Sequence, residues 1–371
     1  MDSVKNVALP VSDPSKVREN WKGRSGMTRR GAYAAASYMA SAVLLVMFNK
    51  AALSSYSFPY ANVITLFQMI FSCSLLYVLK HYKIISFTAE EPHGTDDKPT
   101  TLVSYKALVH TLPLAVSYLL YMLVTMESVR GINIPMYTAL RRTTVAVTMI
   151  VEYLLTGKKH SLPVVGSVGI ILLGAFIAGA RDLSFDAYGY AVVFMANLCT
   201  AIYLALIARI GKSSGLNSFG LMWCNGIICG PMLLFWTSVR GDLGAIMKFP
   251  YLFLPGFQAV MLLSCIMAFA INYFVFLNTT LNSALTQTIC GNLKDLFTIS
   301  LGWLLFGGLP FDLVSLKYSY QSCLVTLLYF SHTSGHILII IVIFFPQLNT
   351  VGQFLAFLGS CLYAYYKLLG K

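Results

Sequence analysis

Charged residues are scarce in this chain. Of its 371 residues only 11% are Asp, Glu, Lys or Arg, whereas 57% are hydrophobic. A soluble domain of this size needs a charged surface, so the composition excludes one and indicates an all-α polytopic membrane protein. The formal charge of +12 does not indicate a nucleic-acid partner, because the basic residues cluster at the ends of apolar segments instead of forming one polar patch.

Several functional motifs are also missing. The eight cysteines are scattered, with no Cys-x-x-Cys pair and no histidine cluster beside them, which argues against a redox motif or a metal site. No phosphate loop, hydrolytic triad or carboxylate pair stands out, so we expect neither an ATP-driven pump nor an enzyme, and no cofactor. The polar, basic tail 1–30 lacks an apolar core, so we expect no cleaved signal peptide.

What the chain does contain is long apolar stretches. Ten of them approach the roughly 20 residues that cross a bilayer. They fall near residues 31–51, 60–80, 105–127, 133–155, 161–180, 187–210, 217–239, 253–277, 280–306 and 349–369. A short polar turn, 181–186, divides them into two sets of five. The sequence therefore predicts ten transmembrane helices in two halves, 31–180 and 187–369.

The distribution of lysine and arginine predicts the orientation. If the N-terminus is cytosolic, 17 of the 26 basic residues lie on the cytosolic side, five on the far side and four within spans. Cytosolic loops carry the excess of basic residues in membrane proteins. We therefore expect both ends of the chain to be cytosolic.

Two cationic sites occupy matching places in the two halves. Arg141 and Arg142 interrupt the fourth apolar stretch of the first half, and Lys294 interrupts the fourth of the second. Both stretches run on to a Leu-Leu-x-Gly ending. A charge within the bilayer costs at least roughly 2.5–3.5 kcal/mol and marks a substrate path or a buried pair. Two facing cationic sites predict a midplane pocket for an anion such as a phosphate or pyrophosphate.

The neighbours of these cations suggest how the roles divide. Arg141 and Arg142 are about 100° apart on a helix, so we expect one to bind substrate while the other pairs with an acid such as Asp295. Tyr137 lies one turn before Arg141 on the same face. The alternatives are that both arginines are structural and that Tyr137 is a core aromatic. Asp295 is also expected to neutralise a cation when the pocket is empty.

Other polar residues within spans are weaker candidates. Asn292 precedes Lys294, and Asn49 precedes Lys50 at the end of the first span, where Lys50 can equally extend to the membrane surface. Asn225 and Asn272 are amides inside the seventh and eighth spans. Such an amide can read a nucleobase edge, although bonding between helices is the commoner use.

Residues 314–347 do not fit the regular pattern. They hold two apolar patches in a place where a short turn suffices, and a connection this long is unusual in a compact bundle. Val-Ser at the start and Phe-Phe-Pro-Gln at the end can be encoded by splice-donor and splice-acceptor consensus sequences. Our hypothesis is a retained, in-frame intron. The alternatives are a genuine lumenal insertion or an eleventh span.

In the segments that hold the intramembrane cations and amides, the chain resembles the nucleotide-sugar transporters of the drug/metabolite transporter superfamily. The resemblance covers roughly 30–313 and 348–369. It rests on Phe48-Asn49-Lys50, on the run from Tyr137 to Arg142, on the position of Asn225, and on Gly291-Asn292-Leu293-Lys294-Asp295. The run from Gly307 to Asp312 and the ending from Tyr363 to Lys367 are similar to the UDP-sugar subgroup.

The resemblance implies ten helices in two inverted five-helix repeats around a central cavity. It implies exchange of a cytosolic nucleotide sugar, best matched by UDP-N-acetylglucosamine, for a lumenal nucleoside monophosphate such as UMP. Lys294 is then the phosphate-binding lysine, Asn292 a sugar or phosphate contact, and Asn225 the amide that recognises the base. A Golgi membrane is favoured over the endoplasmic reticulum.

Two other functions stay open. One is a phosphorylated-sugar/phosphate exchanger of the same fold, which needs no base-reading amide. The other is a non-transporting splice variant with a regulatory role, which rests on 314–347. Small residues along the fifth and tenth spans, such as Gly174 and Gly352, predict close helix packing, either within the chain or in a homodimer.

Overall fold

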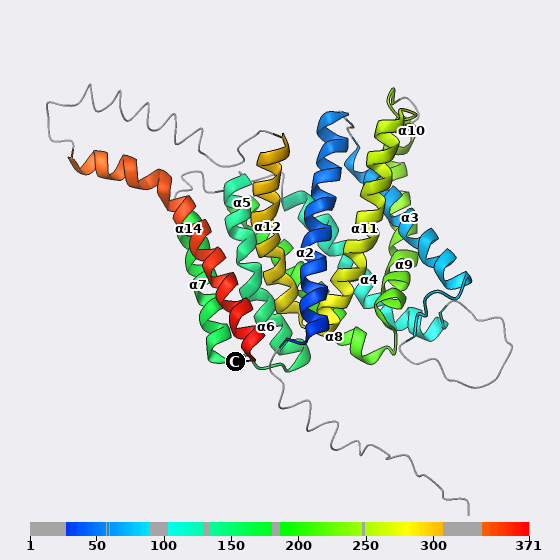
Figure 1. Ribbon diagram of the computed structural model, residues 1–371, viewed down its shortest axis with the longest axis horizontal. Coiled ribbons are helices and arrows are strands. Elements are labelled where there is room, and N and C mark those ends of the chain that lie inside the picture. The colour runs from blue at the N-terminus through cyan, green and yellow to red at the C-terminus, as the bar shows by residue number, and fades with distance from the viewer. Residues whose placement is uncertain are drawn as a thin grey trace, which may run out of the picture.

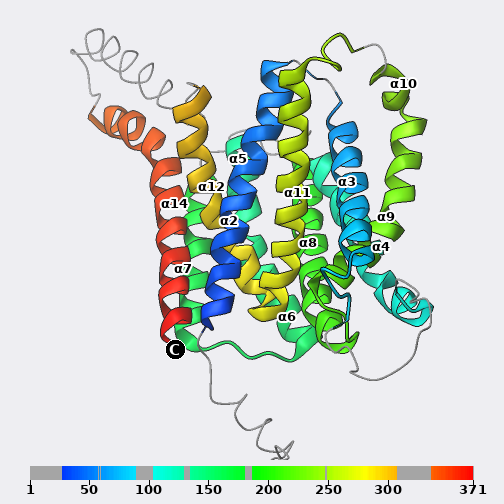
Figure 2. The ribbon, with the colours of Figure 1, turned by 45° about the vertical axis from the view of Figure 1, so that its right-hand side comes forward.

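The computed structural model describes residues 27–56, 58, 60–88, 103–128, 134–179, 186–246, 249–306 and 336–370, which form a bundle of long helices (Figures 1 and 2). The helices are α2 (Arg29–Lys50), its π-helical continuation η1 (Ala51–Ser55), α3 (Ala61–His81), α4 (Tyr105–Ser128), α5 (Ile134–Arg142), α6 (Thr144–Thr156), α7 (Leu162–Gly179), α8 (Ala187–Ser213), α9 (Ser218–Val239), α10 (Asp242–Ile246), α11 (Pro255–Leu281), α12 (Ala284–Phe306) and α14 (His336–Leu369). Within these ranges the one β-type pairing is an isolated bridge between Thr88 and Leu216.

Seven of the described helices are long and apolar enough to cross a membrane. They are Arg29–Leu53, Asn62–His81, Tyr105–Thr125, Leu162–Gly179, Ala187–Ser213, Ser218–Val239 and Pro255–Leu281. Helical backbone satisfies its own N–H and C=O groups, which is what a segment in lipid requires. The chain is therefore an all-helical polytopic membrane protein, as its composition predicts. The other three predicted stretches correspond to the pair α5–α6, to α12 and to α14.

Polar residues at the helix ends mark where the spans begin and end. The side chains of Thr28, Asp186 and Asn217 cap α2, α8 and α9 by accepting a hydrogen bond from a backbone N–H of the first turn. Helix α6 ends at the first Leu-Leu-x-Gly sequence, where Gly157 has a φ of 66°. Glycine adopts this left-handed conformation without steric cost, so the helix stops there.

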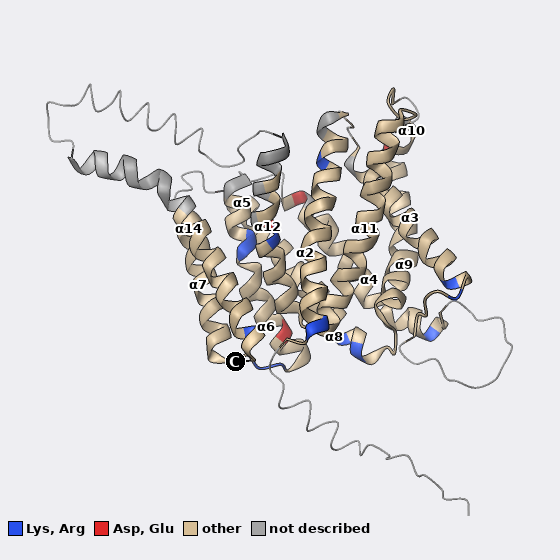
Figure 3. Cartoon of the chain, in the orientation of Figure 1, with Lys and Arg blue, Asp and Glu red and all other residues tan. Residues whose placement is uncertain are grey.

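The helices pack so that distant parts of the sequence meet. Helix α2 lies against α11 and α12, α8 lies against α4 and α6, and α3 lies against α9. The backbone N–H of Met27 donates to the carbonyl oxygen of Lys367 at 2.9 Å, so the start of α2 and the end of α14 lie at one end of the bundle. Figure 3 shows that many of the described basic residues gather at that end, while a few lie within the bundle.

Helix α7 lies along α14 at very close range, and small residues make this possible. A Cβ added to Gly174 would overlap the backbone of Ala356 and Gly352, and one added to Gly359 would overlap the backbone of α7. Of the two alternatives that the sequence leaves open for these residues, the structure shows packing within one chain. The homodimer stays a prediction.

Part of the atypical segment belongs to the last helix. Residues 314–335 lie outside the described residues, whereas α14 begins at His336 and runs to Leu369. The helix therefore contains the predicted last span, 349–369, and extends back into the atypical segment. The physical reason is the apolar run 337–345, which a helix accommodates by satisfying the backbone polar groups internally. The helix passes continuously across the predicted segment end at residue 347.

Candidate binding cavity

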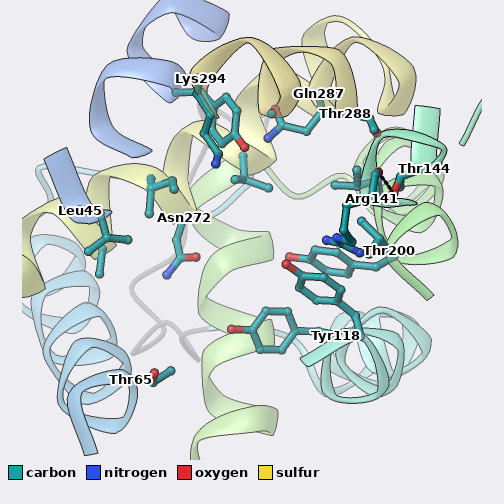
Figure 4. Close-up of a pocket in the computed structure, with 18 of the residues that line it drawn as sticks. Leu45, Thr65, Tyr118, Arg141, Thr144, Thr200, Asn272, Gln287, Thr288 and Lys294 are labelled. Carbon is teal, nitrogen blue, oxygen red and sulfur yellow. Dashed lines mark hydrogen bonds between the residues drawn. The ribbon is translucent and has the colours of Figure 1, made fainter. Parts of the chain in front are cut away.

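A cavity of about 430 Å³ lies between the helices and takes side chains from α2, α3, α4, α5, α6, α8, α11 and α12. Figure 4 shows Arg141, Lys294, Asn272, Gln287 and Tyr118 arranged around one central space. The volume is within the range of small-molecule sites, which runs from about 300 to 1,000 Å³. The wall combines apolar and aromatic side chains with a few polar groups, as such sites do.

The two predicted cationic sites meet at this cavity. Arg141 lies in the last turn of α5 and Lys294 near the middle of α12, and both line the cavity. They come from the two halves of the sequence, and Figure 4 shows them at separate places on the cavity wall. The described lining therefore offers two cationic hydrogen-bond donors to one ligand.

Asp295 also lines the cavity and accompanies Lys294. Its Oδ1 lies 2.7 Å from the Nζ of Lys294, and the two side chains keep 41% and 22% of their surface exposed. The sequence suggested Asp295 as a partner for an arginine across the bundle; the ion pair in the structure joins it to its sequence neighbour. Among the described lining residues, two cations and one carboxylate leave a net charge of +1. The pair is consistent with the expected neutralisation of a cation in the empty pocket.

The fourth apolar stretch is not one continuous α-helix, and both arginines lie in the last turn before its break. It divides at Thr143 into α5 and α6. Arg141 donates from Nη1 to Asn197 Oδ1 at 3.2 Å and to Thr200 Oγ1 at 3.1 Å, both on α8. Arg142 donates from Nη1 to the backbone carbonyl of Gln353 on α14 at 3.1 Å. Of these two arginines, Arg141 is the one that lines the described cavity.

Tyr137 is half-buried and is not among the lining residues of the described cavity. Lys50 is likewise outside the lining and is exposed. Asn49, its neighbour, has a different place in the structure. Its Oδ1 accepts hydrogen bonds from Gln68 Nε2 at 3.0 Å and from Ser264 Oγ at 2.6 Å, which ties α2 to α3 and α11. Gln68 in turn lines the cavity.

The predicted amides are placed differently from one another. Asn225 is 8% exposed, its Oδ1 lies 3.7 Å from the Sγ of Cys229 on the next turn, and it is absent from the described lining. Asn292 also lies outside that lining, with a buried Nδ2 that has no hydrogen-bond partner among the described residues. Asn272 on α11 does line the cavity. Of these three asparagines, Asn272 is therefore the one that lines the described cavity.

Sequence reasoning missed an aromatic group on the cavity wall. The rings of Tyr121 and Tyr203 stack with centroids 5.6 Å apart and planes within 4°, and Tyr118 contacts Tyr203 at 5.4 Å between centroids. All three line the cavity, as does Gln287 on α12. The available signal was the spacing of Tyr118 and Tyr121, which places both on one face of α4. A hydroxyl-bearing ring can contact a ligand through its face and its polar edge.

Comparisons with known proteins agree with a transport cavity. The sequence profile of the triose-phosphate transporter family matches residues 29–314. The match ends where the sequence predicts the atypical segment to begin. A UDP-N-acetylglucosamine transporter of Arabidopsis thaliana is 59% identical over 377 residues, covering 99% of each chain. A UDP-sugar transporter of Caenorhabditis elegans, sqv-7, is 32% identical over 282 residues, covering 76% of this chain and 82% of its own.

A nucleotide sugar transporter of Homo sapiens is 31% identical over 278 residues, covering 75% of this chain and 79% of its own. A solved crystal structure superposes with a TM-score of 0.51 over 90% of this chain and 97% of its own, at 10% sequence identity. At that identity the likeness concerns the fold alone.

Proposed function

This chain belongs to the triose-phosphate transporter family, and from that premise we propose that it exchanges a cytosolic UDP-sugar, UDP-N-acetylglucosamine, for lumenal UMP. The family and the relatives are transporters, so the chain is a membrane transport protein for nucleotide sugars and not an enzyme. The choice of sugar rests on the name of the relative that is 59% identical.

The observation that carries the proposal is the convergence of Arg141 and Lys294 on one cavity. A nucleotide sugar carries its charge on the diphosphate, and charge-assisted hydrogen bonds from arginine and lysine replace the water that the diphosphate loses. The uridine and the sugar are neutral and need shape and neutral hydrogen bonds. Asn272, Gln287 and the tyrosine group supply such contacts on the same cavity wall.

The charge of the cavity supports obligatory exchange. Without an anion, the lining of the described cavity keeps a net positive charge, and only Lys294 has a carboxylate partner. Carrying uncompensated charge through the closed state is costly in a low-dielectric interior. A nucleotide sugar in one direction and UMP in the other bring phosphate oxygens to the cations, so that neither Arg141 nor Lys294 crosses without a counter-charge. The empty carrier is therefore expected to cross slowly.

We further propose ten crossings in two inverted five-helix repeats, with alternating access to the cavity. Arg141 in the fourth predicted span and Lys294 in the ninth are then counterparts. The hydrogen bond between Met27 and Lys367 supports an even number of crossings, since it places both ends on one side. By the excess of basic residues that side is the cytosol, and the proposed membrane is the Golgi, with the endoplasmic reticulum second.

The decisive experiment is uptake of labelled UDP-N-acetylglucosamine into proteoliposomes. Vesicles preloaded with UMP should accumulate label, while vesicles without internal nucleotide should accumulate little. Equal uptake with and without UMP contradicts exchange. No uptake of any UDP-sugar into UMP-loaded vesicles contradicts the proposed function.

The same assay tests the atypical segment. A version lacking 314–347 is compared with the full chain. Uptake by both makes the segment a tolerated insertion. Uptake by the shortened chain alone makes the full chain the non-transporting splice variant, for which a regulatory role is then the proposal.

The family profile itself favours a second candidate, exchange of a phosphorylated sugar for phosphate. This substrate also needs the two cations, but it has no base for an amide to contact. Alanine at Asn272, and in parallel at Asn225, separates the two. A changed preference among UDP-, CDP- and GDP-sugars supports a nucleotide substrate. Uptake of a triose phosphate without any nucleotide-sugar uptake supports the second candidate.

A further inference from the structure

The break in the fourth span is a tightened, 3₁₀-type turn close to Arg141. At Thr143 the N–H donates to the carbonyl of Leu140, three residues back, instead of four residues back as in an α-helix. The hydroxyl of Thr143 also donates to the carbonyl of Leu140, at 2.7 Å. The carbonyl of Leu140 therefore accepts two hydrogen bonds from Thr143, one from its N–H and one from its hydroxyl.

One side chain from another helix completes this arrangement. Asn197 of α8 is fully buried. Its Nδ2 donates to the carbonyl of Leu140 at 2.9 Å and contacts the Thr143 hydroxyl at 3.1 Å. Its Oδ1 accepts from the Thr144 hydroxyl at 2.7 Å and from the Arg141 guanidinium at 3.2 Å. The amide therefore holds the broken backbone with one end and the cation with the other.

We propose that Asn197 is a positioning residue that fixes the guanidinium of Arg141 at the edge of the substrate cavity. Asn197 does not itself line the described cavity, so its effect on an anion acts through Arg141. The proposal rests on the proposed function for the identity of the anion. It adds to the proposed function the residue that fixes the position of one of the two cations, Arg141.

The chemistry of the position requires an amide. A buried carbonyl oxygen needs a donor, while a guanidinium needs an acceptor. Asparagine supplies both without charge. Aspartate would keep the acceptor, lose the donor and neutralise Arg141 as an ion pair, and leucine would lose both. A neutral acceptor holds the guanidinium in place yet leaves its charge available to the phosphate.

The test is a double-mutant cycle between Asn197→Ser and Arg141→Ala, with KM and kcat of nucleotide exchange measured in proteoliposomes. Serine leaves room for a water molecule to satisfy the Leu140 carbonyl, so that folding is retained. Alone, Asn197→Ser should raise the KM for both UDP-N-acetylglucosamine and UMP about tenfold, within the range for coupled neighbours. In the Arg141→Ala background it should change KM by less than about twofold, because the group through which it acts is gone.

A purely structural role gives a different result. It lowers the amount of active carrier and the thermal stability, and its effect adds to that of Arg141→Ala. An additive cycle, or an unchanged KM in Asn197→Ser, therefore overturns the proposal. The control is Thr237→Val on α9, another fully buried polar side chain that is not among the lining residues of the described cavity. Its KM should stay as in the unmodified protein.

A second readout separates this proposal from the proposed function. Inorganic pyrophosphate should raise the Tm of the purified protein by binding the cations, without any need for a sugar. If Asn197→Ser reduces this Tm shift, and the double variant reduces it no further than Arg141→Ala alone does, positioning is supported. This holds even if no UDP-sugar is transported. A pyrophosphate shift that is kept in Asn197→Ser contradicts positioning, and no shift in the unmodified protein contradicts the anion site itself.

Discussion

Removing the carboxylate of Asp295 is expected to strengthen substrate binding. In Asp295→Asn the ion pair with Lys294, 2.7 Å long in the structure, is lost. The net charge of the described cavity lining rises from +1 to +2. The substrate diphosphate then no longer competes with a neighbouring carboxylate for the Lys294 ammonium. The KM for the nucleotide sugar should therefore fall.

The size of the effect follows from the exposure of the pair. A hydrogen bond between charged groups contributes about 1.5–3 kcal/mol when it is shielded, whereas exposed ion pairs contribute roughly 0.2–1 kcal/mol. Asp295 keeps 41% of its side-chain surface exposed and Lys294 keeps 22%, so a value of about 1 kcal/mol is appropriate. At 1.4 kcal/mol for a factor of ten, this corresponds to a fall in KM of about fivefold.

The assay is the concentration dependence of initial uptake into UMP-loaded proteoliposomes. The matched control is Asp242→Asn on α10. This carboxylate lies 3.8 Å from Arg240 and is not among the lining residues of the described cavity. It should leave KM unchanged. Uptake into vesicles without internal UMP should fall further in Asp295→Asn, since the empty cavity then carries more uncompensated charge.

An unchanged or raised KM in Asp295→Asn would refute this reasoning. An unchanged KM would mean that the ion pair does not compete with substrate, so Lys294 would not be a phosphate ligand. A raised KM would mean that Asp295 itself contacts the substrate, for example by accepting hydrogen bonds from ribose or sugar hydroxyls.

Three further variants test other parts of the site and the fold. Lys294→Gln should lower uptake at low substrate concentration at least about tenfold, since a charge-assisted bond to phosphate is lost; normal uptake would remove Lys294 from the site. A Cβ added at Gly291 would lie 3.7 Å from the hydroxyl of Tyr38, which is an ordinary contact. Gly291→Ala should therefore transport. Gly291→Leu should fill the cavity and block uptake without lowering the Tm. Gly174→Leu would overlap the backbone of α14 and should lower stability by about 1–3 kcal/mol, seen as a lower Tm. Gly169→Leu is its control, because an added Cβ there meets no atom within 4 Å, and an equal loss of Tm in both would contradict the packing argument.

The helices could be predicted from the sequence because the bilayer sets their length. Helix α8, for example, begins at Ala187 as predicted and ends at Ser213 instead of residue 210. The break at Thr143 could not be predicted, because the residue that stabilises it, Asn197, is distant in sequence and neutral. The extension of α14 back to His336 was not predicted, since the apolar residues before Asn349 looked like part of an insertion.

The site could be predicted as far as charge reveals it. Arg141 and Lys294 stand out because a cation in an apolar stretch needs a reason, and both line the cavity. Neutral polar side chains give no such signal. Asn49 forms hydrogen bonds between helices, while Gln68 and Tyr203 line the cavity. Which amide or hydroxyl faces the ligand depends on helix rotation, which a single sequence does not encode locally.

The pairing of Arg142 also has a consequence for how the protein is made. Its hydrogen-bond partner on α14, Gln353, lies 211 residues further along the chain. Synthesis at about 5–20 residues per second delays that partner by on the order of 10–40 s. The partner of Arg141 on α8 is 56 residues away and emerges much sooner. During this interval the fourth span holds a guanidinium whose final acceptor does not yet exist.

Until α14 is made, the guanidinium of Arg142 needs another acceptor, such as water or a lipid headgroup. Any added length before Gln353 extends the wait, and 314–347 lies in that position. Premature termination anywhere before Gln353 would leave Arg142 without this acceptor, which is a signal that membrane quality control can detect.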